Sequence, residues 1–274
     1  MLKSEIKTIL KTANIKINKV LGQNFLIDQK VVQDMVEAAD LTNTDTVLEV
    51  GPGLGILTEK ISQNNHKVLA IEKDKNLVPY LKNKFKNNKN VEIINQDILK
   101  LQTTDYELLT AHYKIIANLP FYLTSRFLRL FLEYKNKPTV MVLLMQKEVA
   151  ERIVAQKDKS ILSIACELYS EPKIIRQVSR KSFYPKPDID CAIIKFKVFK
   201  KPQYDIEDIK LFFRIVKAGF SARRKQIHNN LAAGLSFSSS QIKKILKKVN
   251  IDPQRRAQTL SLEEWYKLYK TINN

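Results

Sequence analysis

Residues 118–121 combine groups that suit the binding of a flat molecule carrying an amine. Asn118 supplies a side-chain amide, Phe121 supplies an aromatic ring, and Leu119 and Pro120 lie between them. The short apolar run before them predicts a buried strand, which Pro120 ends because proline fixes φ and lacks an N–H. Ligands bind at the carboxyl ends of strands in open α/β sheets, so these residues could face a planar base. A strand-ending turn with a core phenylalanine explains them equally well.

A glycine-rich turn is the second candidate site. Residues 47–55 read VLEVGPGLG, and Gly51 and Gly53 would let the backbone approach a ligand closely. Glu72 ends the next apolar run, where an acid binds a ribose hydroxyl in dinucleotide folds. This spacing fits NAD-dependent dehydrogenases and S-adenosylmethionine (SAM) methyltransferases. The G-x-G-x-G form favours a methyltransferase, and so does Glu49, which would repel a pyrophosphate but suit a cationic methionyl group.

Asp97 follows the third apolar run, where its carboxylate could accept a hydrogen bond from an adenine amino group. Alone, an Asp in such a position is an ordinary turn or N-cap residue. Glu49, Gly51 and Glu72 also stand at strand ends, and together the four predict one cofactor crevice. Asn118 ends the fourth run, so we expect it beside the reactive methyl group.

This arrangement would explain the residue types at 118–121. The exocyclic amine of adenine is a poor nucleophile, because its lone pair is delocalised into the ring. The Asn118 side-chain oxygen and the Leu119 carbonyl could accept both N–H groups and aim the lone pair at the methyl group. Phe121 would stack on the base, worth about 1–3 kcal/mol, and Phe183 could cover its other face or serve only as a core aromatic. Alignment would supply the catalysis, and we predict no metal site.

The elements that must position these residues alternate along the chain. Apolar runs predict strands at 46–50, 68–71, 91–94, 113–117 and 140–145, with helices at 56–62, 77–85 and 125–133. This order predicts a mainly parallel sheet covered on both faces. Helices at 147–155 and 161–169 follow, and two late strands at 174–178 and 192–198 predict an antiparallel edge. Beyond a linker at 199–204, all periodicity is helical.

We therefore expect an α/β domain at 21–199, preceded by a basic arm at 1–20 and followed by a small all-α domain at 200–274. The net charge is +19, of which residues 200–274 carry +10. Such a charge indicates a polyanionic partner, although the 37 lysines against 10 arginines also resemble the bias of an AT-rich genome. In the basic domain, Arg223, Arg224 and Lys225 could be a solvated helix end, but we favour contact with RNA phosphates.

Other features of the sequence indicate where the protein works. The two cysteines, Cys166 and Cys191, form no metal-binding or disulfide pattern, which is typical of a reducing cytosol. The chain has no apolar run of membrane-spanning length and begins without an apolar signal core. We expect a cytoplasmic monomer that does not engage a membrane.

Once these sites are considered together, the sequence resembles the ribosomal small-subunit (16S) RNA adenine dimethyltransferases of the KsgA type. The resemblance covers nearly the whole chain. It is carried by residues 21–26 (LGQNFL), 49–55 (EVGPGLG), 118–121 (NLPF), 146–152 (QKEVAER), 183–187 (FYPKP), 220–225 (FSARRK), 229–231 (NNL) and 256–260 (RAQTL). Phe121 stands where that pattern more often has Tyr, and Gln258 where it has Glu.

The resemblance implies a class I SAM-dependent methyltransferase with a Rossmann-like sheet and a helical C-terminal domain. It implies conversion of two adjacent adenosines near the 3′ end of small-subunit rRNA to N6,N6-dimethyladenosine, with immature small ribosomal subunits as partner. The matching motifs assign cofactor contacts to Asn24, Leu26, Gly51, Gly53, Glu72, Asp97 and Asn118. Because each nitrogen accepts two methyl groups, the pocket must hold a monomethylated base, and Leu123 and Thr124 could shape it.

Three other functions remain open from the sequence. A related enzyme type methylates a large-subunit rRNA adenine and confers macrolide resistance, and it shares the Gln-Asn-Phe-Leu and Asn-x-Pro-aromatic signatures. The LGQNFL form and the FYPKP loop favour the small-subunit enzyme. An assembly factor could keep the fold and bind RNA without catalysis, although the cofactor residues are intact. A dehydrogenase would leave residues 118–121 without a role.

Overall fold

The computed structural model describes residues 3–63, 66–101 and 112–273. It contains two compact units. The first comprises Met1–Ala150 and Pro172–Val198, and the second comprises Glu151–Glu171 and Phe199–Asn274. The division expected from the sequence placed residues 151–171 with the α/β domain. They group with the C-terminal helices because the backbone carbonyls of Leu168 and Tyr169 accept hydrogen bonds from the N–H groups of Gln203 and Phe199.

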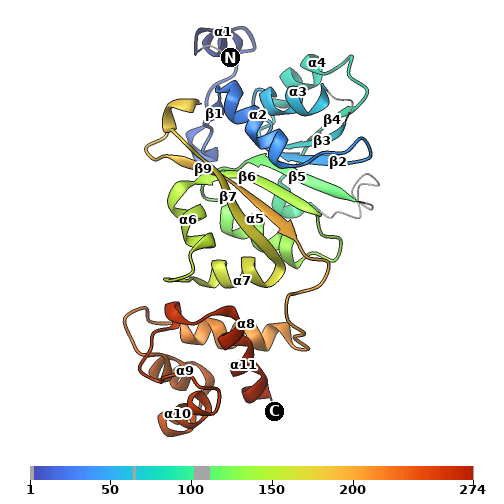
Figure 1. The fold of residues 1–274 in the computed structure, drawn as a ribbon. Helices are drawn as coiled ribbons and strands as arrows, with labels where there is room; N and C mark the ends of the chain where they lie inside the picture. Colours follow the sequence, from blue (N-terminus) through green and yellow to red (C-terminus); the bar gives the residue numbers. More distant parts are fainter. Residues whose placement is uncertain (1–2, 64–65, 102–111, 274) are drawn as a thin grey trace. The chain divides into compact units, whose positions relative to one another are not determined.

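A seven-stranded sheet with the order β4-β3-β2-β5-β6-β9-β7 forms the centre of the first unit (Figure 1). Its parallel strands are β2 (Thr46–Val50), β3 (Lys67–Glu72), β4 (Val91–Asn95), β5 (Tyr113–Asn118) and β6 (Val140–Gln146). Strand β9 (Cys191–Val198) pairs antiparallel with β6, and β7 (Ser170–Val178) lies beyond it at the edge. The predicted fold, a mainly parallel sheet with an antiparallel edge, is confirmed.

The sequence predicted the inner strands to within a residue or two at each end, because both of their faces are covered and their side chains are nearly all apolar. Strand β7 begins four residues before its predicted start. Its exposed and less exposed positions alternate, and its first half, Ser-Glu-Pro-Lys, has no apolar run. Pro172 is tolerated there because an edge strand can spare one N–H donor.

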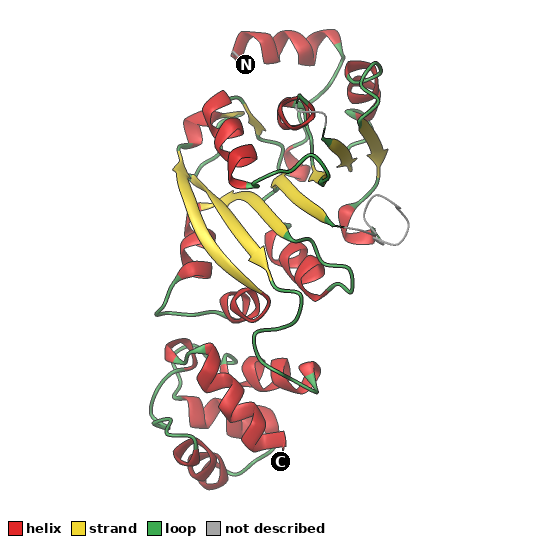
Figure 2. Cartoon of the chain, turned by 45° about the vertical axis from the view of Figure 1, so that its right-hand side comes forward, coloured by secondary structure: helices red, strands yellow, loops and turns green. Residues whose placement is uncertain are grey.

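Helices cover the sheet, as Figure 2 shows in red against the yellow strands. They are α2 (Gln29–Ala38), α3 (Ile56–Ser62), α4 (Val78–Lys84), α5 (Thr124–Glu133) and α6 (Lys147–Val154). Pro79 lies in the first turn of α4, where its missing N–H has no intrahelical partner to lose. Helix α4 therefore begins one residue later than the start predicted at residue 77.

The N-terminal segment is better ordered than its charge suggested. Helix α1 (Lys3–Thr12) buries Ile6 and Leu10 in the same apolar core as Met35 of α2. A short 3₁₀ turn (Lys19–Leu21) then leads to β1 (Phe25–Leu26), which pairs antiparallel with β8 (Phe183–Tyr184). This two-stranded ladder holds segments that lie about 160 residues apart in the chain.

The second unit is helical, as predicted. It contains α7 (Ile161–Tyr169), α8 (Ile209–Gly219), α9 (Ile227–Leu235), α10 (Ser239–Lys248) and α11 (Leu262–Asn273). Its core is built around Trp265, which is fully buried and stacks on Phe220 with ring centroids 5.7 Å apart. A Cβ on Gly219 would lie 2.4 Å from the Trp265 ring, so this close approach requires glycine. No helix in the described part of the chain is long and apolar enough to cross a membrane.

Candidate active site

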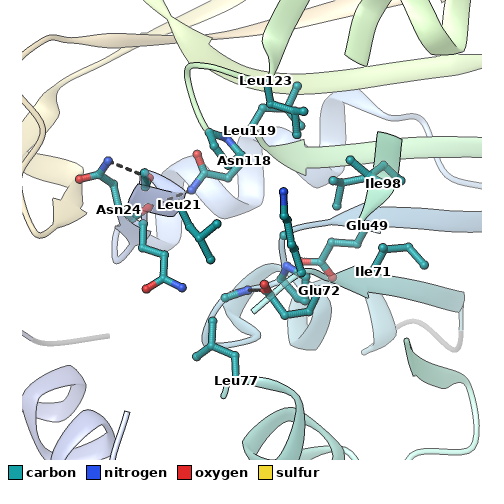
Figure 3. Close-up of a pocket in the computed structure, with 18 of the residues that line it drawn as sticks. Leu21, Asn24, Glu49, Ile71, Glu72, Leu77, Ile98, Asn118, Leu119 and Leu123 are labelled. Atoms are coloured by element: carbon teal, nitrogen blue, oxygen red, sulfur yellow. Dashed lines mark hydrogen bonds between the residues drawn. The ribbon is translucent and has the colours of Figure 1, made fainter. Parts of the chain in front are cut away.

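A cavity of about 220 Å³ opens at the carboxyl ends of the parallel strands (Figure 3). The strands end together because their registers align: Val50 of β2 lies opposite Ile71 of β3 and Ala117 of β5. The cavity is lined by the residues that the sequence analysis assigned to cofactor binding or catalysis, namely Asn24, Leu26, Glu49, Gly51, Gly53, Glu72, Asp97, Asn118, Leu119, Pro120, Phe121 and Phe183.

The glycine-rich turn forms one wall of the cavity. Gly53 has a φ of +59°, and a Cβ built on it would lie 3.0 Å from Cδ1 of Phe25. Gly55, at the N-cap of α3, has a φ of +74° and leaves no room beside the Phe85 ring, 2.7 Å from its built Cβ. A side chain at either position would strain the backbone and displace an aromatic ring. The turn thus exposes its backbone to the cavity.

Glu72 presents a carboxylate at the end of β3, held in place by backbone donors. Its Oε1 accepts a hydrogen bond from the N–H of Asp74 at 2.7 Å, and its Oε2 accepts one from the N–H of Gly53 at 3.3 Å. Burial raises the pKa of Glu72 to about 7, and the charge of Asp74 adds to this effect, while the two N–H donors oppose it.

Glu49 is more deeply buried, with 1% of its surface exposed. Its Oε2 has no hydrogen-bond partner in the described part of the chain. Burial raises the pKa of Glu49 to about 8, and repulsion by Glu72 contributes. An unpartnered carboxylate oxygen beside a second buried acid is costly unless a cation or donor meets it. The two buried carboxyl groups of Glu49 and Glu72 therefore fit a cationic ligand that also carries hydroxyl groups, as SAM does.

Asp97 lines the cavity and also caps a 3₁₀ turn, so its role in the turn is compatible with a role in ligand binding. Its Oδ1 accepts from the N–H of Leu99, and its Oδ2 pairs with Nζ of Lys73 at 2.9 Å. Burial alone would raise the pKa of Asp97, but the bonds from Lys73 and Leu99 outweigh it and hold the pKa below its usual value. Asp97 is therefore an ionised acceptor at neutral pH.

The orientation of the Asn118 amide is set by a contact that the sequence did not reveal. Its Nδ2 donates to the backbone carbonyl of Asn24 at 3.1 Å, one of the dashed lines in Figure 3. Because the amide nitrogen is committed to Asn24, the amide oxygen is left as the acceptor. This polarity is the one needed to bind an exocyclic amine. Sequence reasoning assigned Asn24 to the cofactor, and no pattern could show that its main chain orients Asn118.

The side chain of Gln23, which lines the cavity, connects the N-terminal segment to the loop after β3. Its Nε2 donates to Oδ2 of Asp74 at 2.7 Å, and its Oε1 accepts from the N–H of Asn18 at 2.7 Å.

Phe183 is 2% exposed and belongs to the apolar core, yet it also lines the cavity. It reaches this place because Phe183 pairs with Leu26 in the β1–β8 ladder. The two interpretations of Phe183 are therefore compatible.

Arg223, Arg224 and Lys225, here called the basic turn, lie in the second unit between α8 and α9 and are exposed. The side chain of Asn230, 2% exposed, donates to the carbonyls of Gly219 and Ala222 at 2.6 and 3.0 Å and so holds this turn. The basic turn does not line the cavity.

Among the described residues, no group of three or more His, Cys, Asp or Glu side chains could hold a metal ion.

The sheet order, the glycine-rich turn and the row of acids at the strand ends define a class I, Rossmann-like methyltransferase that depends on SAM. The chain belongs to the ribosomal RNA adenine dimethylase family, whose family model matches residues 14–274. It is 44% identical over 271 residues to a ribosomal RNA small subunit methyltransferase A of Dehalococcoides mccartyi, covering 97% of this chain and 92% of the relative.

Two solved structures share the fold. A dimethyladenosine transferase from Plasmodium falciparum superposes with a TM-score of 0.77 at 21% identity, covering 91% of this chain and 97% of that one. The 23S rRNA methyltransferase ErmE superposes with a TM-score of 0.73 at 23% identity, covering 92% and 100%. At these identities the likeness concerns the fold, so it does not separate a small-subunit from a large-subunit substrate.

Proposed function

We propose that this protein uses SAM to convert two adjacent adenosines near the 3′ end of small-subunit rRNA to N6,N6-dimethyladenosine during assembly of the small ribosomal subunit. The observation that carries this proposal is the Asn118 amide, whose oxygen is left to accept an amine. It lines the same cavity as Glu49, Glu72 and Asp97, here called the cofactor wall. The 44% identity to a small-subunit methyltransferase supports the choice of substrate.

The cofactor, when bound, supplies an electrophilic methyl group. Glu72 would accept hydrogen bonds from ribose hydroxyls, and Asp97 would accept one from the adenine amino group. Glu49 would supply negative charge to the cationic end of the cofactor, and Gly51 and Gly53 would let the backbone come close. Each role uses a group that lines the cavity.

The target adenine would lie against Asn118 and Phe121. The Asn118 oxygen and the Leu119 carbonyl accept the two N–H groups, which favours a pyramidal nitrogen with its lone pair available. Phe121, partly buried at the cavity wall, stacks on the ring. No strong base is required, since a nitrogen that has used its lone pair to accept a methyl group releases its proton readily. The chain's contribution is therefore alignment.

The second methyl transfer needs room for the first methyl group. Leu123 lines the cavity and is 6% exposed, so it offers an apolar wall for that methyl group. Thr124 is buried but does not line the cavity, so we assign the shaping role to Leu123. The basic turn, in a unit rich in positive charge, supports binding to the phosphate backbone of RNA.

The test is to incubate the protein with labelled SAM and either immature small subunits or large-subunit RNA, and then to map the modified adenines. We expect two neighbouring dimethylated adenosines in the small-subunit RNA. Label in large-subunit RNA alone would replace this proposal with the macrolide-resistance activity. RNA binding without transfer to either substrate would indicate a non-catalytic assembly factor.

A further inference from the structure

The mouth of the cavity has its own chemistry, distinct from that of the cofactor wall. Most of the residues that line the cavity are buried or partly buried. Among the described lining residues, only Lys73, Tyr122 and Arg126 are exposed. These three side chains therefore mark where the cavity meets solvent. Lys73 already has an ion-pair partner, because its Nζ pairs with Asp97 at 2.9 Å.

Arg126, in the first turn of α5, is a cation without a partner among the described residues. Within the described part of the chain it makes no ion pair, hydrogen bond or ring contact. Arg129 lies one turn further along the same helix and behaves differently. It pairs with Glu133 at 3.3 Å and does not line the cavity. The two arginines share a helix and a charge, but of the two only Arg126 lines the cavity, and it has no ion-pair partner in the described ranges.

Tyr122 directly follows Phe121 and exposes 54% of its surface. It is the only aromatic residue among the exposed large apolar side chains of the described residues. An exposed flat ring and an exposed guanidinium that line the same cavity match two parts of a nucleotide. The ring offers a stacking surface for a base, and the guanidinium offers two parallel donors for a phosphate.

We propose that Tyr122 and Arg126 hold the nucleotide next to the one in the cavity. The second target adenosine stacks on Tyr122, and Arg126 binds the phosphate that joins the two adenosines. When one base enters a pocket and its neighbour stays outside, their shared phosphate must lie at the mouth. This inference rests on the proposed function, and it identifies what keeps the second adenosine in place while the first is modified.

The test measures methyl transfer to immature small subunits by the full-length protein, with KM and kcat determined over a range of salt concentrations. Arg126→Ala is compared with Arg129→Ala as a matched loss of charge. We expect Arg126→Ala to raise KM about fivefold and to reduce the log–log salt slope by about one, as for one lost phosphate contact. Arg129→Ala should change neither quantity.

The aromatic half is tested with Tyr122→Leu and Tyr122→Phe. We expect Tyr122→Leu to raise KM about tenfold, within the range for one stacked base. It should also increase the fraction of RNA that carries dimethylation on only one of the two adenosines, as read by mass spectrometry. Tyr122→Phe keeps the ring and should retain wild-type behaviour. Calorimetric binding of S-adenosylhomocysteine should be unchanged in all four variants, which separates loss of RNA contact from misfolding.

Each outcome decides a separate point. If Arg126→Ala and Arg129→Ala have equal KM values and salt slopes, Arg126 does not bind the phosphate. If Tyr122→Leu matches Tyr122→Phe in KM and in product pattern, the ring does not hold the second adenosine. Either result with an active wild-type protein overturns this inference and leaves the proposed function intact. No transfer by the wild-type protein overturns the proposed function, and this inference with it.

Discussion

Replacing Glu49 with Gln should remove most of the pH dependence of SAM binding between pH 7 and pH 9. Glu49 is fully buried, its Oε2 has no partner in the described part of the chain, and its pKa is raised to about 8. Two charged groups also act on this pKa: the charge of Glu72 raises it further, and the charge of Lys84 opposes this. The carboxyl must lose its proton before it can stabilise a cationic ligand, so binding and ionisation are coupled.

The size of the effect follows from the two raised pKa values. With a pKa of about 8, roughly one tenth of Glu49 is ionised at pH 7 and roughly nine tenths at pH 9, so affinity should rise about tenfold, or about 1.4 kcal/mol. Glu72, with a pKa of about 7, goes from half to nearly full ionisation and adds about twofold. The wild-type protein should gain up to about 20-fold, and Glu49→Gln only about twofold.

The assay is calorimetric titration with SAM at pH 7, 8 and 9 for both proteins. The amine of the ligand also titrates in this range, so the informative quantity is the ratio of wild-type to variant affinity at each pH. Glu37→Gln is the matched control, because Glu37 lies on α2, is exposed, accepts a hydrogen bond from Gln33 and does not line the cavity. It should keep the wild-type pH profile. A Glu49→Gln protein with the wild-type pH slope would refute the coupling.

Three further outcomes are expected. In the cofactor-free protein, the pKa values of Glu49 and Glu72 are raised from 4.5 to about 8 and about 7, so the folded state binds more protons than the unfolded state between these limits. The free energy of unfolding should therefore fall as pH rises from about 5 to about 8 and level off above that. Thermal denaturation from pH 5 to 9 measures this, and a rise would contradict it. Asn118→Ala should lower methyl transfer at least about 100-fold with subunit binding nearly unchanged, and retained turnover would remove Asn118 from catalysis. Replacing all three side chains of the basic turn with Ala should reduce the log–log salt slope of RNA binding by about two to three, and an unchanged slope would exclude them from the interface.

Much of the fold was predictable because its central strands carry unambiguous local signals. The inner strands have continuous apolar runs, and each ends in a residue that disrupts it, such as Gly51, Pro120 or a carboxylate. Parallel strands place those ends at one edge of the sheet, so strand order was not needed to expect that Glu72, Asp97 and Asn118 lie together. The edge strand β7 lacked such a run, and its first half was missed.

Contacts between distant segments were not predictable, because nothing local encodes them. The β1–β8 ladder joins Leu26 to Phe183 and brings that ring to the cavity. Helix α1 looked like a charged arm, yet Ile6 and Leu10 dock into the core. Residues 151–171 group with the C-terminal helices through hydrogen bonds across the chain.

By itself, the sequence determined the class of fold and the candidate cofactor and substrate residues that line the cavity, because these depend on residue types at strand ends. Only the tertiary structure decided how those residues act. It showed that the Asn24 carbonyl accepts from the Asn118 amide nitrogen and leaves the amide oxygen as the acceptor, and that burial raises the pKa values of Glu49 and Glu72. It also separated Arg126 from Arg129. Amide polarity, proton affinity and exposure are all set by neighbours in space, which a linear pattern does not contain.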